Sequence, residues 1–239
     1  MGLSTVEQSE VAASIEHDGF ATTPPVVPQL IVDRLVAELS GLTRSEAARV
    51  GIRNLFEISA AVRELATSAA VRQVAESVLG PHCFAVRAIL FDKTAAANWK
   101  VVWHQDLTIA VRERVVTAGF GPWSVKEGVM HVQPPIEVLE RMLAVRVHLD
   151  DCGPDNGPVR VLPRSHRVGR LSASAIDAWR GGASESVDCV AERGAIVAFR
   201  PLILHASSQA TVPGHRRVVH LDFAAEELPE PLAWYERFA

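Results

Sequence analysis

A short apolar stretch near the middle of the chain carries polar side chains at a spacing that suits metal binding. It reads VVWHQDLTIAV, residues 101–111, and contains His104 and Asp106. In an extended chain, residues two positions apart point to the same face, so the imidazole and the carboxylate would lie side by side. Such a pair supplies two ligands of a metal site, or it forms a simple hydrogen bond in a core or at a strand end.

His205 is the best placed of the other histidines to provide a third ligand. It ends the apolar stretch AIVAFRPLILH, and the small residues that follow it leave room for a ligand beside the imidazole. Two histidines and one carboxylate form the facial triad of non-heme iron(II) oxygenases. Three octahedral positions then remain, two for a bidentate 2-oxo acid and one for O2.

Arg216, eleven residues after His205, predicts how that acid is held. It opens the apolar segment RRVVHLDFA, and no acidic residue lies between His205 and Arg216. A buried arginine needs an anionic partner, and its planar fork matches the geometry of a carboxylate. We therefore expect Arg216 to bind the far carboxylate of the 2-oxo acid.

Two kinds of segment must position these residues. The first third of the chain has apolar residues at helical spacing in segments that stop at Asp18-Gly19, before Gly41 and at Gly80-Pro81. After Pro81 come short segments rich in β-branched residues, which predict strands at 83–92, 142–150, 158–163, 194–206 and 216–224. The connections 107–141 and 164–193 are long and mixed, which is typical of lids and binding loops.

Helices followed by many short strands predict a mainly β, α+β fold, in which a helical layer packs on an antiparallel jelly roll. We expect one domain over residues 1–239, with a helical layer at 1–82, a jelly-roll core at 83–225 and a C-terminal tail at 226–239. In 142–150, alternate apolar residues form one face for packing. Arg146 lies on the other face, which either lines the barrel mouth or is solvated.

Composition narrows the classes of partner. The chain has 239 residues, 48% of them hydrophobic and 22% charged, and a net charge of −4 without a basic block. This favours neither nucleic acid nor a membrane surface as a partner. The three cysteines are widely spaced, as in reduced thiols, and we expect a cytoplasmic protein with a small-molecule substrate. No basic cluster indicates a coenzyme A phosphate site, and nothing indicates the oligomeric state.

Three segments of the chain resemble a known family. WHQD, DDCGPDNGPVRVLPRSHR and GAIVAFRPLILHASSQATVPGHRRVVHLDFA are similar to the phytanoyl-CoA dioxygenase-like branch of the iron(II)/2-oxoglutarate oxygenases. The resemblance runs from about residue 91 to residue 224. It implies a double-stranded β-helix with N-terminal helices, iron(II) as the metal, and 2-oxoglutarate and O2 as co-substrates.

The same resemblance implies roles for individual residues. His104, Asp106 and His205 would be the iron ligands, and Arg216 would anchor 2-oxoglutarate with help from the hydroxyl of Ser207. Arg217 is the other candidate for this anchor. Strand alternation points only one of the two side chains inward, and the spacing of eleven residues from His205 favours Arg216. In related halogenases a small residue replaces the carboxylate, so that chloride binds iron, and Asp106 argues against that chemistry.

Five further residues are candidates for contacts in the site. Lys93 and Arg146 could reach the co-substrate, and His131, Gln133 and Trp123 could reach the substrate; each could equally serve packing or solvation. We expect hydroxylation of an unactivated C–H bond of a small metabolite, with release of succinate and CO2. The triad does not distinguish hydroxylation from desaturation, epimerisation or cyclisation, and a non-catalytic metal-binding jelly-roll sensor is the alternative outside the enzymes.

Overall fold

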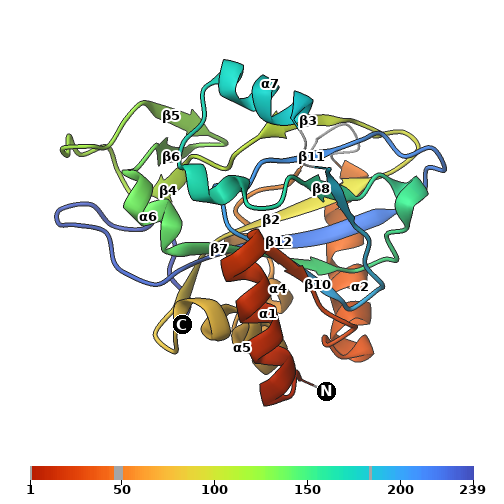
Figure 1. Ribbon diagram of the computed structural model, residues 1–239. Helices are drawn as coiled ribbons and strands as arrows, with labels where there is room; N and C mark the ends of the chain where they lie inside the picture. Colours follow the sequence, from red (N-terminus) through yellow and green to blue (C-terminus); the bar gives the residue numbers. More distant parts are fainter. Residues whose placement is uncertain (1, 46–50, 183–184) are drawn as a thin grey trace.

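The computed structural model describes residues 2–45, 51–182 and 185–239, and its N-terminal third is mainly helical (Figure 1). Helix α1 (Thr5–Asp18) begins with a capping box, in which the side chains of Ser4 and Glu7 each accept from the other's backbone N–H. It ends at Gly19, whose φ of 90° is left-handed and suits a residue without a Cβ atom. The predicted end of this helix is therefore confirmed.

The predicted end of the second helix is wrong. Helix α2 (Gln29–Ser45) continues through Gly41 to Ser45. A single glycine inside a helix costs only about 1 kcal/mol relative to alanine, which does not end a helix by itself. Three shorter helices follow: α3 (Leu55–Ile58), α4 (Ala60–Ala66) and α5 (Ala69–Leu79). In the described part of the chain, no helix has both the length and the hydropathy needed to cross a membrane.

The helices cover one face of a five-stranded antiparallel sheet (Figure 1). Its order is β1-β10-β7-β12-β2, and its strands are β1 (Phe20–Thr22), β10 (Ile196–Phe199), β7 (Met142–His148), β12 (Arg216–Ala224) and β2 (Phe84–Lys93). The predicted apolar face of β7, with Leu143, Val145 and Val147, packs in one core cluster with the helices. The opposite face of this sheet, which we call its inner face, carries Arg146.

A second, four-stranded sheet closes over the inner face. Its order is β3-β11-β8-β9, with β3 (Val101–His104), β11 (His205–Ser207), β8 (Val159–Val161) and β9 (Val187–Cys189). A separate cluster, which includes Val161 of β8 and Val197 of β10, packs between the two sheets. Two antiparallel sheets with a core between them, and helices outside, confirm the predicted jelly-roll class.

The segment 194–206, predicted as one strand, is divided between the two sheets. Strand β10 ends at Phe199, a turn follows, and β11 starts at His205. Pro201 interrupts the strand, because it has no N–H for the ladder and restricts the residue before it. The interruption carries the chain from the five-stranded sheet to the four-stranded sheet.

The two long connections contain structure of their own. A three-stranded sheet of order β4-β6-β5 lies in the first, with β4 (Ile109–Val111), β5 (Trp123–Lys126) and β6 (Val129–Val132), and the short helix α6 (Ile136–Glu140) follows it. The second connection contains the 3-10 turn Ser165–Val168 and helix α7 (Ala173–Gly181). The 3-10 turn Pro154–Asn156 lies between β7 and β8, and ends at Gly157 with a left-handed φ of 59°.

Residues outside the predicted jelly-roll core also pair with it. Strand β1 extends the five-stranded sheet, and Ile52 forms an isolated bridge to Leu90 of β2. In the tail, Phe238 bridges to Ala85 and Trp234 to Val111. The helical layer and the tail thus add backbone hydrogen bonds to the sheets and do not only cover them.

Candidate metal centre

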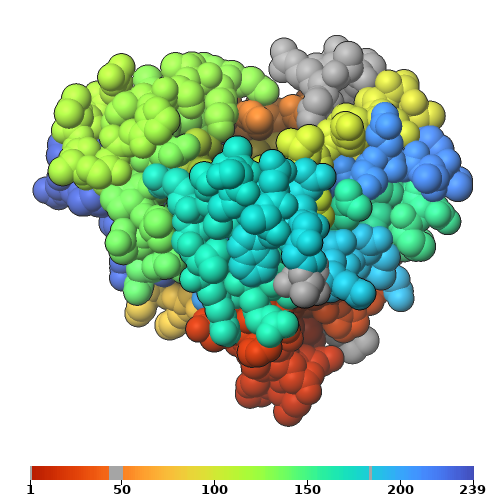
Figure 2. All heavy atoms as spheres, turned by 45° about the horizontal axis from the view of Figure 1, so that its top comes forward, coloured from red at the N-terminus to blue at the C-terminus, as the bar shows by residue number. Residues whose placement is uncertain are grey.

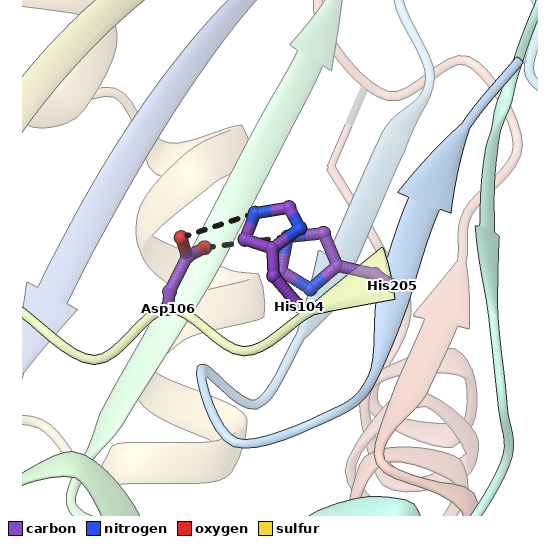
Figure 3. Close-up of side chains that lie close together, drawn as sticks. All are labelled: His104, Asp106 and His205. Atoms are coloured by element: carbon purple, nitrogen blue, oxygen red, sulfur yellow. Dashed lines mark ion pairs between the residues drawn. The ribbon is translucent and has the colours of Figure 1, made fainter. Parts of the chain in front are cut away.

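His104, Asp106 and His205 lie together at one end of the β3–β11 strand pair (Figure 3). His104 is the last residue of β3 and His205 the first of β11, and the two are direct partners in the antiparallel β3–β11 pair. Their ring centroids are 4.2 Å apart. Asp106 lies beyond the end of β3, where its backbone N–H donates to the carbonyl of Pro201 at 2.9 Å. Strand pairing and this loop contact together bring the three side chains to one point.

The side-chain geometry fits a bound cation. Asp106 Oδ1 lies 3.9 Å from His104 Nε2, and Asp106 Oδ2 lies 3.6 Å from His205 Nε2. These separations exceed the length of a hydrogen bond, whereas the three ligand atoms all lie within 4.8 Å of one another. The group therefore offers a space between its ligand atoms instead of a closed hydrogen-bonded cluster.

Backbone contacts fix the orientation of both imidazoles. His104 Nδ1 lies 2.8 Å from the carbonyl oxygen of Val102, and His205 Nδ1 lies 3.0 Å from that of Ile203. A carbonyl only accepts, so each Nδ1 carries the proton and each Nε2 presents its lone pair towards Asp106. Second contacts of this kind are what orient metal-bound histidines in proteins.

Electrostatics keeps these groups in the form that binds a metal. Burial lowers the pKa of His205 to about 4, so that its imidazole is neutral near pH 7. Burial alone would raise the pKa of Asp106, but the neighbouring His205 and His104 outweigh it and hold that pKa below its usual value. A neutral imidazole beside a carboxylate has the donor chemistry of an iron(II) site.

Three buried cations lie on the inner face of the five-stranded sheet, one each on β2, β7 and β12. Lys93 is 0% exposed, Arg216 is 3% exposed and Arg146 is 6% exposed. None of the three forms an ion pair with a carboxylate in the described residues, and the Nε atoms of Arg146 and Arg216 have no hydrogen-bond partner at all. Burial and the nearby charge of Arg216 lower the pKa of Lys93 to about 8. Buried positive charge without a counter-ion suits a dicarboxylate ligand.

Ser207 joins two of these cations. Its hydroxyl accepts from Lys93 Nζ at 3.0 Å, lies 3.4 Å from Arg216 Nη1, and donates to the carbonyl of Gly157 at 3.0 Å. Arg216 also donates to the carbonyl of Gly157. Arg217 points to the other face of β12, where it forms a two-point ion pair with Asp150.

A cavity of about 240 Å³ connects the triad with Arg216. It is lined by Arg53, Arg87, Ile89, Phe91, Trp99, Val101, His104, Asp106, Thr108, Lys126, Arg146, Val159, His205, Ala206, Ser207, Arg216 and His220. Figure 2 shows a hollow between the green β4–β6 region and the cyan α7 segment. The cavity thus combines the predicted iron ligands, the predicted anchor and an apolar wall.

Three residues predicted to contact substrate lie outside the lining of this cavity. His131 is buried in β6, and its Nδ1 lies 3.1 Å from the carbonyl oxygen of Val129. Trp123 of β5 is partly buried and packs against an apolar cluster, and the backbone of Gln133 is hydrogen-bonded to Gly121 and Pro122. Contact with a substrate stays a prediction for each of them.

Arg53, Arg87 and Lys126 also line the cavity, and none of them was predicted as a site residue. A signal existed for Arg87, because alternation along β2 places it with Ile89 and Phe91 and opposite Ala88 and Leu90. Arg53 precedes α3 and Lys126 ends β5, and neither follows a periodic pattern that points inward.

Comparison with known proteins agrees with this geometry. The phytanoyl-CoA dioxygenase (PhyH) family matches residues 15–218. Human peroxisomal phytanoyl-CoA dioxygenase is 21% identical over 250 residues, which covers 89% of this chain and 67% of the relative. Ectoine dioxygenase from Nocardia farcinica is 24% identical over 262 residues, covering 94% and 81%.

The fold is shared with solved structures. The non-heme alpha-ketoglutarate-dependent carbocyclase SnoK from nogalamycin biosynthesis superposes with a TM-score of 0.72 at 13% identity, over 94% of this chain and 85% of SnoK. The family match and the two relatives confirm the resemblance and, with the triad, the predicted class of enzyme, a dioxygenase that uses iron(II) and 2-oxoglutarate. The chain belongs to the phytanoyl-CoA dioxygenase family.

Proposed function

We propose that this enzyme hydroxylates an unactivated C–H bond of a small metabolite, with release of succinate and CO2. The observation that carries the proposal is the convergence of two Nε2 atoms and one carboxylate in a cavity that also holds buried cations without carboxylate partners. When bound together, iron(II) and 2-oxoglutarate supply the oxidising chemistry by activating O2. The role of the protein is to hold, orient and shield the reactants.

His104, Asp106 and His205 would hold the metal through Nε2, a carboxylate oxygen and Nε2. Their backbone supports are already in place, because both Nδ1 atoms are bound to carbonyls and Asp106 is held through its own N–H. Little reorganisation is then needed on binding, which keeps the metal geometry fixed during turnover.

Arg216 would hold the carboxylate of 2-oxoglutarate that lies far from the metal. Its unpartnered Nε offers a donor, and the adjacent Ser207 hydroxyl, which donates to Gly157 in this structure, would turn towards the same carboxylate. Lys93 and Arg146 add positive charge in the same region, and we propose that they stabilise the bound dianion.

The apolar wall would position the substrate and limit water. Ile89 and Phe91 face the cavity from β2, and Val101 and Val159 face it from the four-stranded sheet. Such a wall excludes solvent from the reacting atoms, which prevents side reactions and strengthens the polar contacts.

The same site could carry out a cyclisation, desaturation or epimerisation. One observation favours keeping cyclisation in view, namely the likeness of the fold to the carbocyclase SnoK. The relative ectoine dioxygenase is, by its name, an enzyme that transfers oxygen, which favours hydroxylation. The protein residues at the metal do not separate these outcomes, so the product must be identified.

A screen for succinate release tests the proposal. Purified enzyme with iron(II), ascorbate and 2-oxoglutarate is mixed with members of a metabolite library, and succinate and product mass are measured. We expect substrate-dependent succinate and a product with one added oxygen. Asp106→Ala is the control, and succinate that persists in this variant would show that the release does not come from the proposed site.

A further inference from the structure

The geometry points to a second anion site in the cavity, at Arg53, Arg87 and Lys126, and we infer that the substrate carries a carboxylate or phosphate group that binds there. This inference rests on the proposed function, because it names the class of substrate for the same metal centre. The three residues are far apart in the sequence, which explains why no basic cluster is visible in the chain.

Three separate elements bring these cations to one cavity. Arg87 projects from the inner face of β2, Lys126 is the last residue of β5, and Arg53 precedes α3. The backbone next to Arg53 is fixed by the bridge between Ile52 and Leu90, with hydrogen bonds of 2.9 and 2.8 Å. All three side chains line the cavity that also contains the triad.

The positive charge at this end is only partly compensated. Arg87 is paired with the buried carboxylate of Asp222. Lys126 Nζ donates to Thr108 Oγ1 at 2.8 Å and has no carboxylate partner in the described residues. Arg53 forms a long, partly exposed ion pair with Glu127, with Nε 3.7 Å from Oε1, so its charge is only partly compensated. The cluster therefore has room for an incoming anion.

Mutual repulsion supports this assignment. Burial, and then the positive charges of Arg87 and Arg53, lower the pKa of Lys126. Burial and the charge of Arg87 likewise lower the pKa of Arg53. An anion between these groups would relieve the repulsion and replace the water that the cations have lost.

This end of the cavity is distinct from the proposed 2-oxoglutarate end. Arg87 and Lys93 lie six positions apart on β2, opposite Asp222 and Arg216 of β12. At about 3.3 Å per residue along a strand, the Cα atoms of Arg87 and Lys93 are roughly 20 Å apart. In the proposed binding mode, both carboxylates of 2-oxoglutarate are already used, one at the metal and one at Arg216, so none is left for Arg53 and Lys126.

The residues between the two ends indicate the rest of the ligand. Ile89 and Phe91 lie between Arg87 and Lys93 on the same face of β2, and both line the cavity. A substrate with an acid group at Arg53 and Lys126 would place an apolar body over Ile89, towards the triad. The inferred class is thus a small acid with an aliphatic or alicyclic body, and Thr108 offers a further hydroxyl to the acid group.

Binding of inorganic phosphate tests the site without knowledge of the substrate. Co(II)-loaded enzyme saturated with 2-oxoglutarate, and kept free of O2, is titrated with phosphate while the line width of the phosphorus NMR signal is followed. Acetate, followed by carbon NMR, gives the carboxylate arm. We expect saturable binding by the wild type. Arg53→Gln and Lys126→Gln should each weaken it about tenfold or more, because each removes a charge-assisted hydrogen bond.

Matched controls separate this site from general charge effects. Arg34→Gln and Lys100→Gln remove the same charges at exposed positions outside the cavity and should leave phosphate affinity unchanged. Arg53→Lys keeps the charge and should restore most of the affinity lost in Arg53→Gln. Equal phosphate affinity in the wild type, Arg53→Gln and Lys126→Gln would overturn the inference.

The same samples keep the two proposals apart. Co(II) and 2-oxoglutarate affinities are measured for each variant, and we expect both to be unchanged by Arg53→Gln and Lys126→Gln. A wild type that fails to bind 2-oxoglutarate would contradict the proposed function, whereas phosphate titration of the metal-free protein would still decide the anion site. Loss of phosphate binding in Arg216→Gln, with no loss in Lys126→Gln, would place the phosphate at the 2-oxoglutarate end and overturn the inference.

Discussion

His104 and His205 face each other across the β3–β11 pair, and each is anchored in the same way, through Nδ1 to the carbonyl of the residue two positions earlier. The shared anchor turns both Nε2 atoms towards Asp106. Local hydrogen bonding therefore prepares the two imidazoles for a common ligand before any metal binds.

Replacing any member of the triad with alanine should abolish turnover and weaken iron(II) binding, because two remaining ligands do not fix the metal geometry. Metal affinity and succinate release check this for His104→Ala, Asp106→Ala and His205→Ala. His131→Ala is a matched control for metal binding, since His131 has the same Nδ1 contact to a carbonyl but lies outside the triad. A triad variant with wild-type iron affinity would not have lost a ligand.

Arg216→Gln should sharply raise the KM for 2-oxoglutarate. Removing one partner of a buried, charge-assisted contact costs about 2–5 kcal/mol, which corresponds to a change of at least tenfold. Arg217→Gln is the control, because Arg217 points away from the cavity and pairs with Asp150. Steady-state kinetics at varied 2-oxoglutarate measures both, and a larger effect of Arg217→Gln would reverse the assigned orientation of β12.

Acid should destabilise the protein through His148. Burial, followed by the charges of Arg146 and Arg216, lowers the pKa of His148 from 6.5 to about 3. Between these values the unfolded state binds the extra proton, so stability is fully present above pH 6.5 and falls as the pH falls towards 3. One such group contributes a slope that approaches about 1.4 kcal/mol per pH unit.

Urea unfolding at a series of pH values checks this slope. His148→Phe should flatten the pH dependence below pH 6.5, because the residue then has no proton to gain. His17→Phe is the control, since His17 is exposed at the end of α1. The same slope in the wild type and in His148→Phe would assign the acid sensitivity to other groups.

Asp222→Asn should destabilise the fold strongly. The substitution leaves the guanidinium of Arg87 buried without its counter-ion, which typically costs about 3–5 kcal/mol. Asp177→Asn breaks an exposed pair with Arg180 and should change the free energy of unfolding by less than about 1 kcal/mol. Equal effects of the two substitutions would mean that the Arg87–Asp222 pair is not desolvated as the structure indicates.

Much of the site could be read from the sequence, because its signals are local. The alternation of apolar and polar residues indicates which face of a strand is buried, and this applies to Arg146 and Arg216 as the structure places them. The H-x-D spacing also brings His104 and Asp106 together, although Asp106 lies past the end of β3 and not within a strand.

Features that depend on tertiary contacts could not be read in this way. The division of 194–206 between two sheets depends on where β11 finds its partners, and only the proline hints at it. The cluster of Arg53, Arg87 and Lys126 is assembled by packing of three elements, and none of them has a local pattern that predicts the other two. The continuation of helix α2 past Gly41 could not be predicted either, because the helix propensity of one residue does not determine where a helix ends.

Reaction with isotopically labelled O2 in the presence of chloride, once a substrate is found, tests the central claim most directly. With Asp106 as an oxygen ligand, the wild type should give succinate together with a product that is heavier by one labelled oxygen, and no chlorinated product. A product lighter by two hydrogens would indicate desaturation or cyclisation instead of hydroxylation. A product of unchanged mass would indicate epimerisation. A chlorinated product of the wild type would contradict the role given to Asp106.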